Sequence, residues 1–199
     1  MKIIGLTGGI ASGKTRVSNI LKKLGAIILD ADKIAREVVK KGQPAYQDII
    51  AYFGKEILLG DGEIDRGKLA TLVFNNPAAL DKLNHFTHPR IFEKIDKEIK
   101  TYKQICKKDV IIIDAALLIE TDLKNMVEEI WLVSVPEKIQ KNRLMDRDKI
   151  SSTEADKRIK AQMPLEEKIS FADRVIDNSG NVEELTAQVK KIWELIIEK

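Results

Sequence analysis

The fold is decided by the stretch Gly8-Gly9-Ile10-Ala11-Ser12-Gly13-Lys14-Thr15, which fits the phosphate-loop pattern G-x-x-x-x-G-K-[ST]. The apolar run Lys2–Thr7 precedes it and predicts a buried strand. After it, Val17, Ile20, Leu21 and Leu24 recur with helical spacing. A strand, a glycine-rich loop and a helix in this order predict a site for a nucleoside triphosphate.

Each part of this loop has a role in binding phosphate. Glycine at positions 8 and 13 allows the backbone to turn its N–H groups toward phosphate oxygens. A helix that starts at Lys14 directs its positive end at the same anion. Lys14 is expected to reach the β- and γ-phosphates, and the Thr15 hydroxyl to bind Mg²⁺. The residues expected to bind ATP here are Gly8, Gly9, Ala11, Ser12, Gly13, Lys14, Thr15 and Arg16.

The rest of the chain alternates short apolar runs with helical segments, which predicts a doubly wound parallel sheet. The expected strands are Lys2–Thr7, Ala26–Leu29, Val110–Ile113, Glu129–Ser134 and Arg174–Ile176. Helix starts are expected at Asn76-Pro77 and at Asn181, where Glu184 completes a capping box. The interval 33–108 is too long for one crossover and predicts a helical insertion. A second irregular piece spans residues 143–172.

Composition favours a small-molecule enzyme. Of 199 residues, 44% are hydrophobic and 33% charged, and the net charge is only +3. Aromatic residues make up 5% and no basic stripe is present, which argues against nucleic-acid binding. The longest apolar stretch is too short to span a bilayer, and no signal peptide is recognisable. With one cysteine, Cys106, which we take as incidental, a reducing compartment fits and we expect a cytoplasmic protein.

Two aspartates follow the second expected strand, at the edge of the sheet where ligands bind in parallel α/β folds. Asp32 is expected to accept the proton of an attacking hydroxyl, as phosphoryl transfer requires. The structural alternative is that an aspartate caps the helix expected over 33–40, and we assign that role to Asp30.

A further aspartate ends the run Val110-Ile-Ile-Ile-Asp114. A hydrophobic strand with a terminal aspartate is typical of the Walker B element, which holds Mg²⁺ directly or through water. Asp114 is therefore expected to bind the metal or the substrate.

Two arginines, Arg143 and Arg147, stand four residues apart on a helix expected to begin near Glu137, so they share a face. Guanidinium forks suit phosphate, and a mobile basic lid excludes water from a transferring phosphoryl group. The alternative is a solvated charged face, in which Asp146 and Asp148 pair with the arginines.

Beyond these motifs, the chain resembles the dephospho-CoA kinase family nearly from end to end. The resemblance rests on Ile4 through Lys14, Leu29 through Arg36, Phe53 through Leu58, Asp61 through Leu69, Val73-Phe74, Thr87-His88-Pro89, Asp114 with Leu117, Leu118 and Glu120, Arg143 and Arg147, Arg158 with Gln162, and Ala172 through Asn178. The middle blocks make this match far more specific than the phosphate loop alone.

The resemblance implies a molecule of three parts. These are a nucleotide-binding core (1–32, 109–142 and 173–199), a helical subdomain for the CoA acceptor (33–108) and a lid (143–172). It also implies transfer of the ATP γ-phosphate to the ribose 3′-hydroxyl of dephospho-CoA, with Mg²⁺ as cofactor and no protein partner. The family usually has a proline where this chain has Ala116, so the following loop is expected to be slightly more mobile.

Site roles follow from the resemblance position by position. Asp32 is the expected base, and Lys14 and Arg143 are expected to stabilise charge. Arg147 would contact ATP. The expected substrate-binding residues are Asp32, His88, Asp114 and Leu117, and the expected metal ligands are Thr15 and Asp114.

Two other classes of protein remain as alternatives. A different small-molecule P-loop kinase, of the nucleoside or nucleotide type, would share the loop but leaves the blocks around Asp61 and His88 unexplained. A GTPase switch should carry N-K-x-D or T-K-x-D, and the chain has neither.

Overall fold

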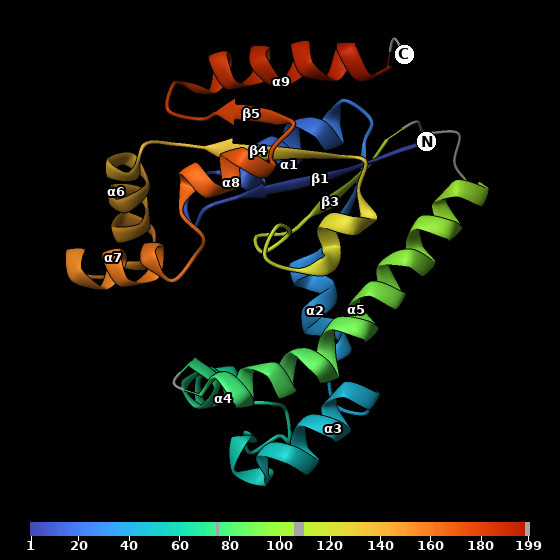
Figure 1. The fold of residues 1–199 in the computed structure, drawn as a ribbon, viewed down its shortest axis with the longest axis vertical. Coiled ribbons are helices and arrows are strands. Elements are labelled where there is room, and N and C mark those ends of the chain that lie inside the picture. Colours follow the sequence, from blue (N-terminus) through green and yellow to red (C-terminus); the bar gives the residue numbers. More distant parts are fainter. Residues whose placement is uncertain (75, 106–109, 198–199) are drawn as a thin grey trace. The chain divides into compact units, whose positions relative to one another are not determined.

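The computed structural model describes residues 1–74, 76–105 and 110–197, and its strands form a parallel sheet (Figure 1). The five strands follow the order β2-β3-β1-β4-β5. They are β1 (Lys2–Gly8), β2 (Ile27–Asp30), β3 (Val110–Asp114), β4 (Glu129–Ser134) and β5 (Arg174–Asp177). All neighbouring pairs are parallel, which confirms the predicted doubly wound class, and the five strands lie within a residue or so of their predicted bounds.

The strands are apolar throughout because both faces of the sheet are covered. On one face, Ile4 and Leu6 of β1 pack with α1 (Lys14–Lys23) and α9 (Val182–Ile197), and all four strands around them contribute to the same core. On the other face, the space beside Gly5 is filled by Leu118, which is fully buried. A Cβ on Gly5 would lie 2.6 Å from a Leu118 methyl carbon, so this close approach requires glycine.

The chain divides into two compact units, which we describe separately: Met1–Asp30 with Cys106–Lys199, and Ala31–Ile105. The second unit is helical, as the long insertion predicts. It contains α2 (Ala31–Val38), α3 (Pro44–Phe53), η1 (Lys55–Ile57), α4 (Arg66–Phe74) and α5 (Pro77–Ile105). It has a core of its own, made of Ile49, Ile57, Ile64, Leu69, Val73 and Ala79.

The predicted helix starts are confirmed by their capping bonds. Asn76 Oδ1 accepts from the N–H of Ala79 at 3.1 Å, at the start of α5. Asn181 Oδ1 accepts from the N–H of Glu184 at 2.8 Å, and Glu184 Oε2 accepts from the N–H of Asn181 at 3.1 Å. The second pair is a complete capping box, and it begins α9.

The first unit also contains η2 (Asp122–Met126), α6 (Glu137–Asp148), α7 (Ser152–Lys160) and α8 (Leu165–Phe171). The predicted border between core and lid, at residue 143, falls inside α6, which continues without a break. The lid therefore stays a prediction, as do the exact bounds of the acceptor subdomain. Cys106 lies outside the described residues. Within them, no helix is both long and apolar enough to cross a membrane.

Candidate active site

The phosphate loop joins β1 to α1, in the strand–loop–helix setting that the sequence predicts. Gly13 stands at the N-cap of α1 with φ 90°, a conformation that glycine adopts without strain. It also needs space, because a Cβ there would lie 2.0 Å from Nδ2 of Asn178. Ala11 has φ 59°, in the left-handed region that a residue with a side chain rarely occupies. The loop is thus held in an unusual backbone shape at two positions.

Contacts with neighbouring elements explain two further loop residues. A Cβ on Gly8 would lie 2.8 Å from the backbone oxygen of Val133 in β4, so this residue must be small. The hydroxyl-bearing side chain of Ser12 is buried against the same glycine. Thr15 and Arg16 lie in the first turn of α1 and are exposed, as side chains that meet a ligand should be.

Lys14 forms an ion pair with Asp114, so the structure brings together two residues chosen from separate motifs. Asp114 is the last residue of β3, and Lys14 is the first of α1. Both side chains are largely buried, with exposed fractions of 16% for Lys14 and 11% for Asp114. The position fits the carboxyl edge of a parallel sheet, where α/β proteins bind their ligands.

The oxygen donors expected for Mg²⁺ are the Thr15 hydroxyl and the Asp114 carboxylate. Such a set fits this ion, which binds through one or two carboxylates and substrate phosphates and keeps several waters. Among the residues that the structure describes, no group of three or more His, Cys, Asp or Glu side chains could hold a metal ion.

Asp30 ends β2 in register with Asp114 on β3, and α2 begins at the next residue. Asp32 lies in the first turn of α2 and is exposed. The border between the two compact units passes between Asp30 and Ala31, so Asp32 belongs to the helical unit. His88, also in that unit, lies on α5 with its ring 5.7 Å from the ring of Phe92.

The loop after β3 sends two leucines in different directions. Leu117 is 49% exposed, whereas Leu118 is buried under β1. Two bonds from β1 hold the start of this loop: the N–H of Ala115 donates to Leu6 O at 3.0 Å, and Thr7 Oγ1 donates to Ala116 O at 3.2 Å. These bonds tether the loop at the position where the family usually has proline.

The two arginines of α6 have different partners. Arg143 is partly buried and donates to the backbone oxygen of Asn178 at 3.0 Å. Arg147 is exposed and bonds Asp148 at 2.7 Å, and Asp148 also pairs with Arg158 at 3.0 Å. The hydrogen bond from Arg147 holds the pKa of Asp148 below its usual value. In this structure Arg147 therefore takes part in the solvated charged network considered as the alternative, while Arg143 is directed toward the residues that hold the phosphate loop.

Asn178 is the site residue that motif analysis missed. It directly follows β5 and is buried, and its Nδ2 donates to the backbone oxygen of Ser12 at 2.7 Å. The same residue accepts from Arg143, so it links that arginine to the phosphate loop. In the sequence, Asn178 is marked by its place after the last strand and by the block from Ala172 to Asn178 that carries the family resemblance, and neither signal indicates this role.

A parallel sheet with a phosphate loop, a lysine and a strand-end aspartate at its carboxyl edge defines a P-loop phosphotransferase. The family described as dephospho-CoA kinase matches residues 2–184. The chain belongs to the dephospho-CoA kinase family.

Individual relatives agree with this assignment. The dephospho-CoA kinase of Carboxydothermus hydrogenoformans is 52% identical over 98% of this chain and 94% of that protein. The structure of dephospho-CoA kinase from Campylobacter jejuni matches with a TM-score of 0.72 at 29% identity, over 98% of both chains. A protein from Thermus thermophilus matches with a TM-score of 0.85 at 30% identity, over 98% of this chain and 97% of the other.

Proposed function

We propose that this protein transfers the γ-phosphoryl group of ATP to the ribose 3′-hydroxyl of dephospho-CoA, giving coenzyme A and ADP. The observation that carries the proposal is the Lys14–Asp114 pair beside the phosphate loop, in a chain whose family match covers residues 2–184. Another small-molecule kinase of the nucleoside or nucleotide type would share the loop, but not a match to this family.

ATP would bind with its phosphates on the loop, through backbone N–H groups between Gly8 and Thr15 and through the ammonium group of Lys14. Arg16 follows in the same turn of α1, and Arg147 would reach ATP only by leaving Asp148. Thr15 and Asp114 would hold Mg²⁺, which when bound neutralises charge on the β- and γ-phosphate oxygens. Once a phosphate is present, Lys14 has an anionic partner other than Asp114.

The chemical step needs one proton acceptor and one charge stabiliser. Asp32 would take the proton of the 3′-hydroxyl as that oxygen forms its bond to the γ-phosphorus. The bond between the γ-phosphorus and the bridging oxygen breaks, and ADP leaves with the electron pair. Arg143 would stabilise the charge on the transferring group, a role suited to its guanidinium fork.

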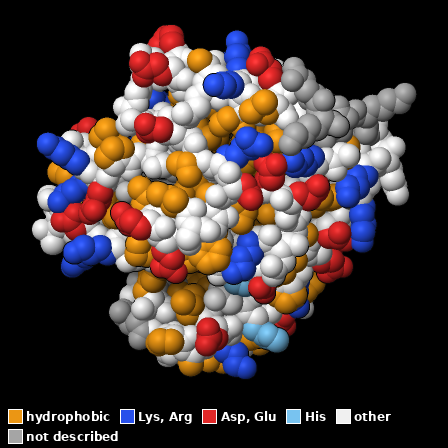
Figure 2. Space-filling model, turned by 45° about the horizontal axis from the view of Figure 1, so that its top comes forward, with side chains coloured by type: hydrophobic (Ala, Val, Ile, Leu, Met, Phe, Trp, Pro, Cys, Tyr) orange, Lys and Arg blue, Asp and Glu red, His pale blue; other side chains and the backbone are white. Residues whose placement is uncertain are grey.

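The acceptor would be held by Asp32, His88, Asp114 and Leu117. The exposed side chain of Leu117 offers apolar surface for it, and the helical unit supplies Asp32 and His88. We place the reaction in the cytoplasm, which suits a chain with a single cysteine. We propose no nucleic-acid or protein partner. On the face in Figure 2, basic and acidic side chains are interspersed and do not form the basic stripe that a nucleic-acid site would require.

An ATP-consumption assay across candidate acceptors tests the proposal. The purified protein is incubated with ATP, Mg²⁺ and one of dephospho-CoA, adenosine, AMP, shikimate or pantothenate. We expect ADP release only with dephospho-CoA, and mass spectrometry should show one added phosphoryl group on its ribose. Turnover of adenosine or AMP in place of dephospho-CoA would overturn the substrate assignment and favour the alternative kinase.

A further inference from the structure

Two glutamine side chains from different segments bind the same residue of the phosphate loop. Gln140, in the first turn of α6, donates from Nε2 to the backbone oxygen of Ile10 at 2.8 Å. Gln162, in the connection between α7 and α8, accepts at Oε1 from the N–H of Ile10 at 2.7 Å. Both backbone groups of one loop residue are thus bonded by side chains distant in sequence.

The backbone decides the orientation of each amide. A carbonyl oxygen can only accept and an N–H can only donate, so Gln140 must present its nitrogen and Gln162 its oxygen. The arrangement also explains the residue next to Ile10. A Cβ on Gly9 would lie 2.7 Å from Nε2 of Gln140, so a side chain there would displace this amide from Ile10.

The position of Ile10 matters because Ala11 follows it with φ 59°. A non-glycine residue stays in this region only when its surroundings hold it there, and such residues gather at ligand-binding sites. The bonds from Gln140 and Gln162 fix the backbone on the N-terminal side of Ala11. They therefore support the loop shape that turns the following N–H groups toward phosphate.

Gln162 is itself on an anchored segment. Lys168 of α8 is 1% exposed and pairs with Glu120, in the loop after β3, at 2.8 Å. Glu120 is partly exposed, but the ammonium group of Lys168 is buried, and separating it from Glu120 would leave a buried charge unpaired, so the pair helps to hold α8 in the first unit. Through Gln162, the α7–α8 connection is then joined to the phosphate loop.

We propose that Gln140 and Gln162 are positioning residues, which hold Ile10 so that the loop is ready for ATP and which link ATP affinity to the placement of the α7–α8 connection. The inference rests on the proposed binding of ATP phosphates by this loop. It concerns neither the proton transfer nor the acceptor, so its effect should be confined to ATP.

Methionine substitutions test it, because methionine keeps the length of glutamine but neither donates nor accepts these bonds. Gln140→Met and Gln162→Met should each raise the Kd for ATP, measured by calorimetry, roughly three- to tenfold, the size expected for one lost hydrogen bond. In the double variant, the Kd for ATP should rise by less than the product of the two single increases, because both side chains hold the same residue, Ile10. The KM for dephospho-CoA and kcat at saturating ATP should stay within about twofold of the wild-type values, which is less than the loss of one hydrogen bond would cause.

Gln188→Met is the matched control, since Gln188 is also a partly buried glutamine of the first unit but lies on α9. It should bind ATP like the wild type. Unchanged ATP affinity in both loop variants would overturn the inference. So would an equal loss of affinity in Gln188→Met, or losses that simply follow a fall in melting temperature. If the wild type itself fails to bind ATP, the proposed function fails instead.

A pair of glutamate substitutions adds a sharper comparison, because each introduces the same charge. A carboxylate can still accept from the N–H of Ile10, but it cannot donate to the carbonyl oxygen. Gln140→Glu should therefore weaken ATP binding more than Gln162→Glu. Equal losses, or the reverse order, would contradict the assigned bonds.

Discussion

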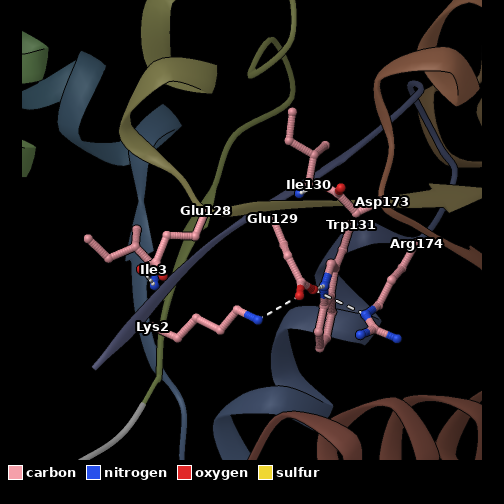
Figure 3. A network of polar contacts seen from close by, with 8 residues as sticks. All are labelled: Lys2, Ile3, Glu128, Glu129, Ile130, Trp131, Asp173 and Arg174. Atoms are coloured by element: carbon pink, nitrogen blue, oxygen red, sulfur yellow. Dashed lines mark hydrogen bonds and ion pairs between the residues drawn. The ribbon is translucent and has the colours of Figure 1, made fainter. Parts of the chain in front are cut away.

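The two edges of the parallel sheet both carry charged side chains, but they use them differently. At the amino edge, Glu129 at the start of β4 accepts from Lys2 Nζ at 2.6 Å, from Trp131 Nε1 at 3.0 Å and from Arg174 Nε at 3.1 Å (Figure 3). Burial alone would raise the pKa of Glu129, but these three donors outweigh it and lower the pKa to about 2.

Neighbouring carboxylates at this edge serve the strands themselves. Glu128 accepts from the N–H of Ile3 at 2.9 Å, and Asp173 accepts from the N–H of Ile130 at 2.8 Å (Figure 3). Each of these three carboxylates accepts hydrogen bonds from a backbone N–H or from side chains of β1, β4 and β5. The amino edge is therefore a closed network that stabilises the sheet.

At the carboxyl edge, by contrast, the pair Lys14–Asp114 joins the start of a helix to the end of a strand. Under the proposed ATP binding, a phosphate would replace Asp114 as the partner of Lys14 while the strands keep their own bonds. The comparison teaches that charge alone does not identify a functional site. Under the proposed function, the two edges differ in whether their charged groups bond only to the sheet or exchange partners with a ligand.

Lys14→Ala should give the largest effect, on activity. Under the proposed function, Lys14 contacts the phosphates and stabilises them more strongly as charge redistributes, so kcat/KM should fall by roughly two orders of magnitude or more. Circular dichroism should show an intact fold. Lys22→Ala, in the exposed last turn of the same helix, is the control and should be silent. Near-normal turnover by a folded Lys14→Ala protein would contradict the phosphate-loop assignment and the functional difference between the two edges.

Asp32→Asn comes next and separates catalysis from helix capping. As the base, Asp32 should contribute about 10²–10⁴ in rate, so kcat should fall at least about a hundredfold with ATP affinity and melting temperature near those of the wild type. If Asp32 only caps the helix, Asp32→Asn should leave both kcat and stability nearly unchanged, and Asp32→Ala should lose roughly 1 kcal/mol of stability. Melting temperature and kcat for both variants decide. Normal turnover by Asp32→Asn would move the base to Asp30 or Asp114.

Much of this fold and part of this site could be predicted from sequence, because their signals are local. The strands follow apolar runs, and Asn76 and Asn181 cap the helices they precede. Lys14 and Asp114 are recognisable because each belongs to a local motif: Lys14 begins the helix after the phosphate loop, and Asp114 ends an apolar strand. The role of Asn178 was not predictable in the same way, since its bond to Ser12 spans 166 positions and depends on how β5 meets the loop.

On α6, the sequence predicts the helix but leaves open the partners of its two arginines. The spacing of Arg143 and Arg147 predicts a shared helix face, and the helix is confirmed. The pairing of Arg147 with Asp148 was open to prediction, because the two residues are neighbours in sequence, and it was given as the alternative. The partner of Arg143 could not be predicted, because Asn178 follows β5, 35 positions away. Helical periodicity fixes where a side chain starts, whereas tertiary packing decides what its end group contacts.

Arg143→Lys should have a smaller effect than the first two changes, and mainly on kcat. An ammonium group lacks the bidentate fork, and the proposed contact with the phosphoryl group would tighten as charge develops, so a loss of roughly tenfold or more is expected. Arg147→Lys provides the comparison, because Arg147 bonds Asp148 here. Steady-state kinetics should show the smaller loss at Arg147. A rise in KM alone for Arg143→Lys would mark it as a residue that binds the ground state only.

Glu129→Gln should give the smallest effect on activity, because it tests the amino edge. The pKa of Glu129 is about 2 in the folded protein, below its value in the unfolded chain, so its charge stabilises the fold at pH above the unfolded pKa. That contribution is lost as the pH falls through about 2, since the folded protein then takes up the proton as well. Glu129→Gln should therefore lower the free energy of unfolding at pH 7 by about 2 kcal/mol, allowing for partial exposure, while kcat and both KM values stay unchanged.

Urea unfolding at pH 7 and at pH 3 measures this, and the gap between wild type and variant should narrow at the lower pH. Glu128→Gln is the neighbouring control, because an amide oxygen can still accept from the N–H of Ile3. It should unfold like the wild type at both values. If Glu129→Gln instead reduced kcat and left stability intact, the amino edge would take part in catalysis. The division between a structural edge and a catalytic edge would then be wrong.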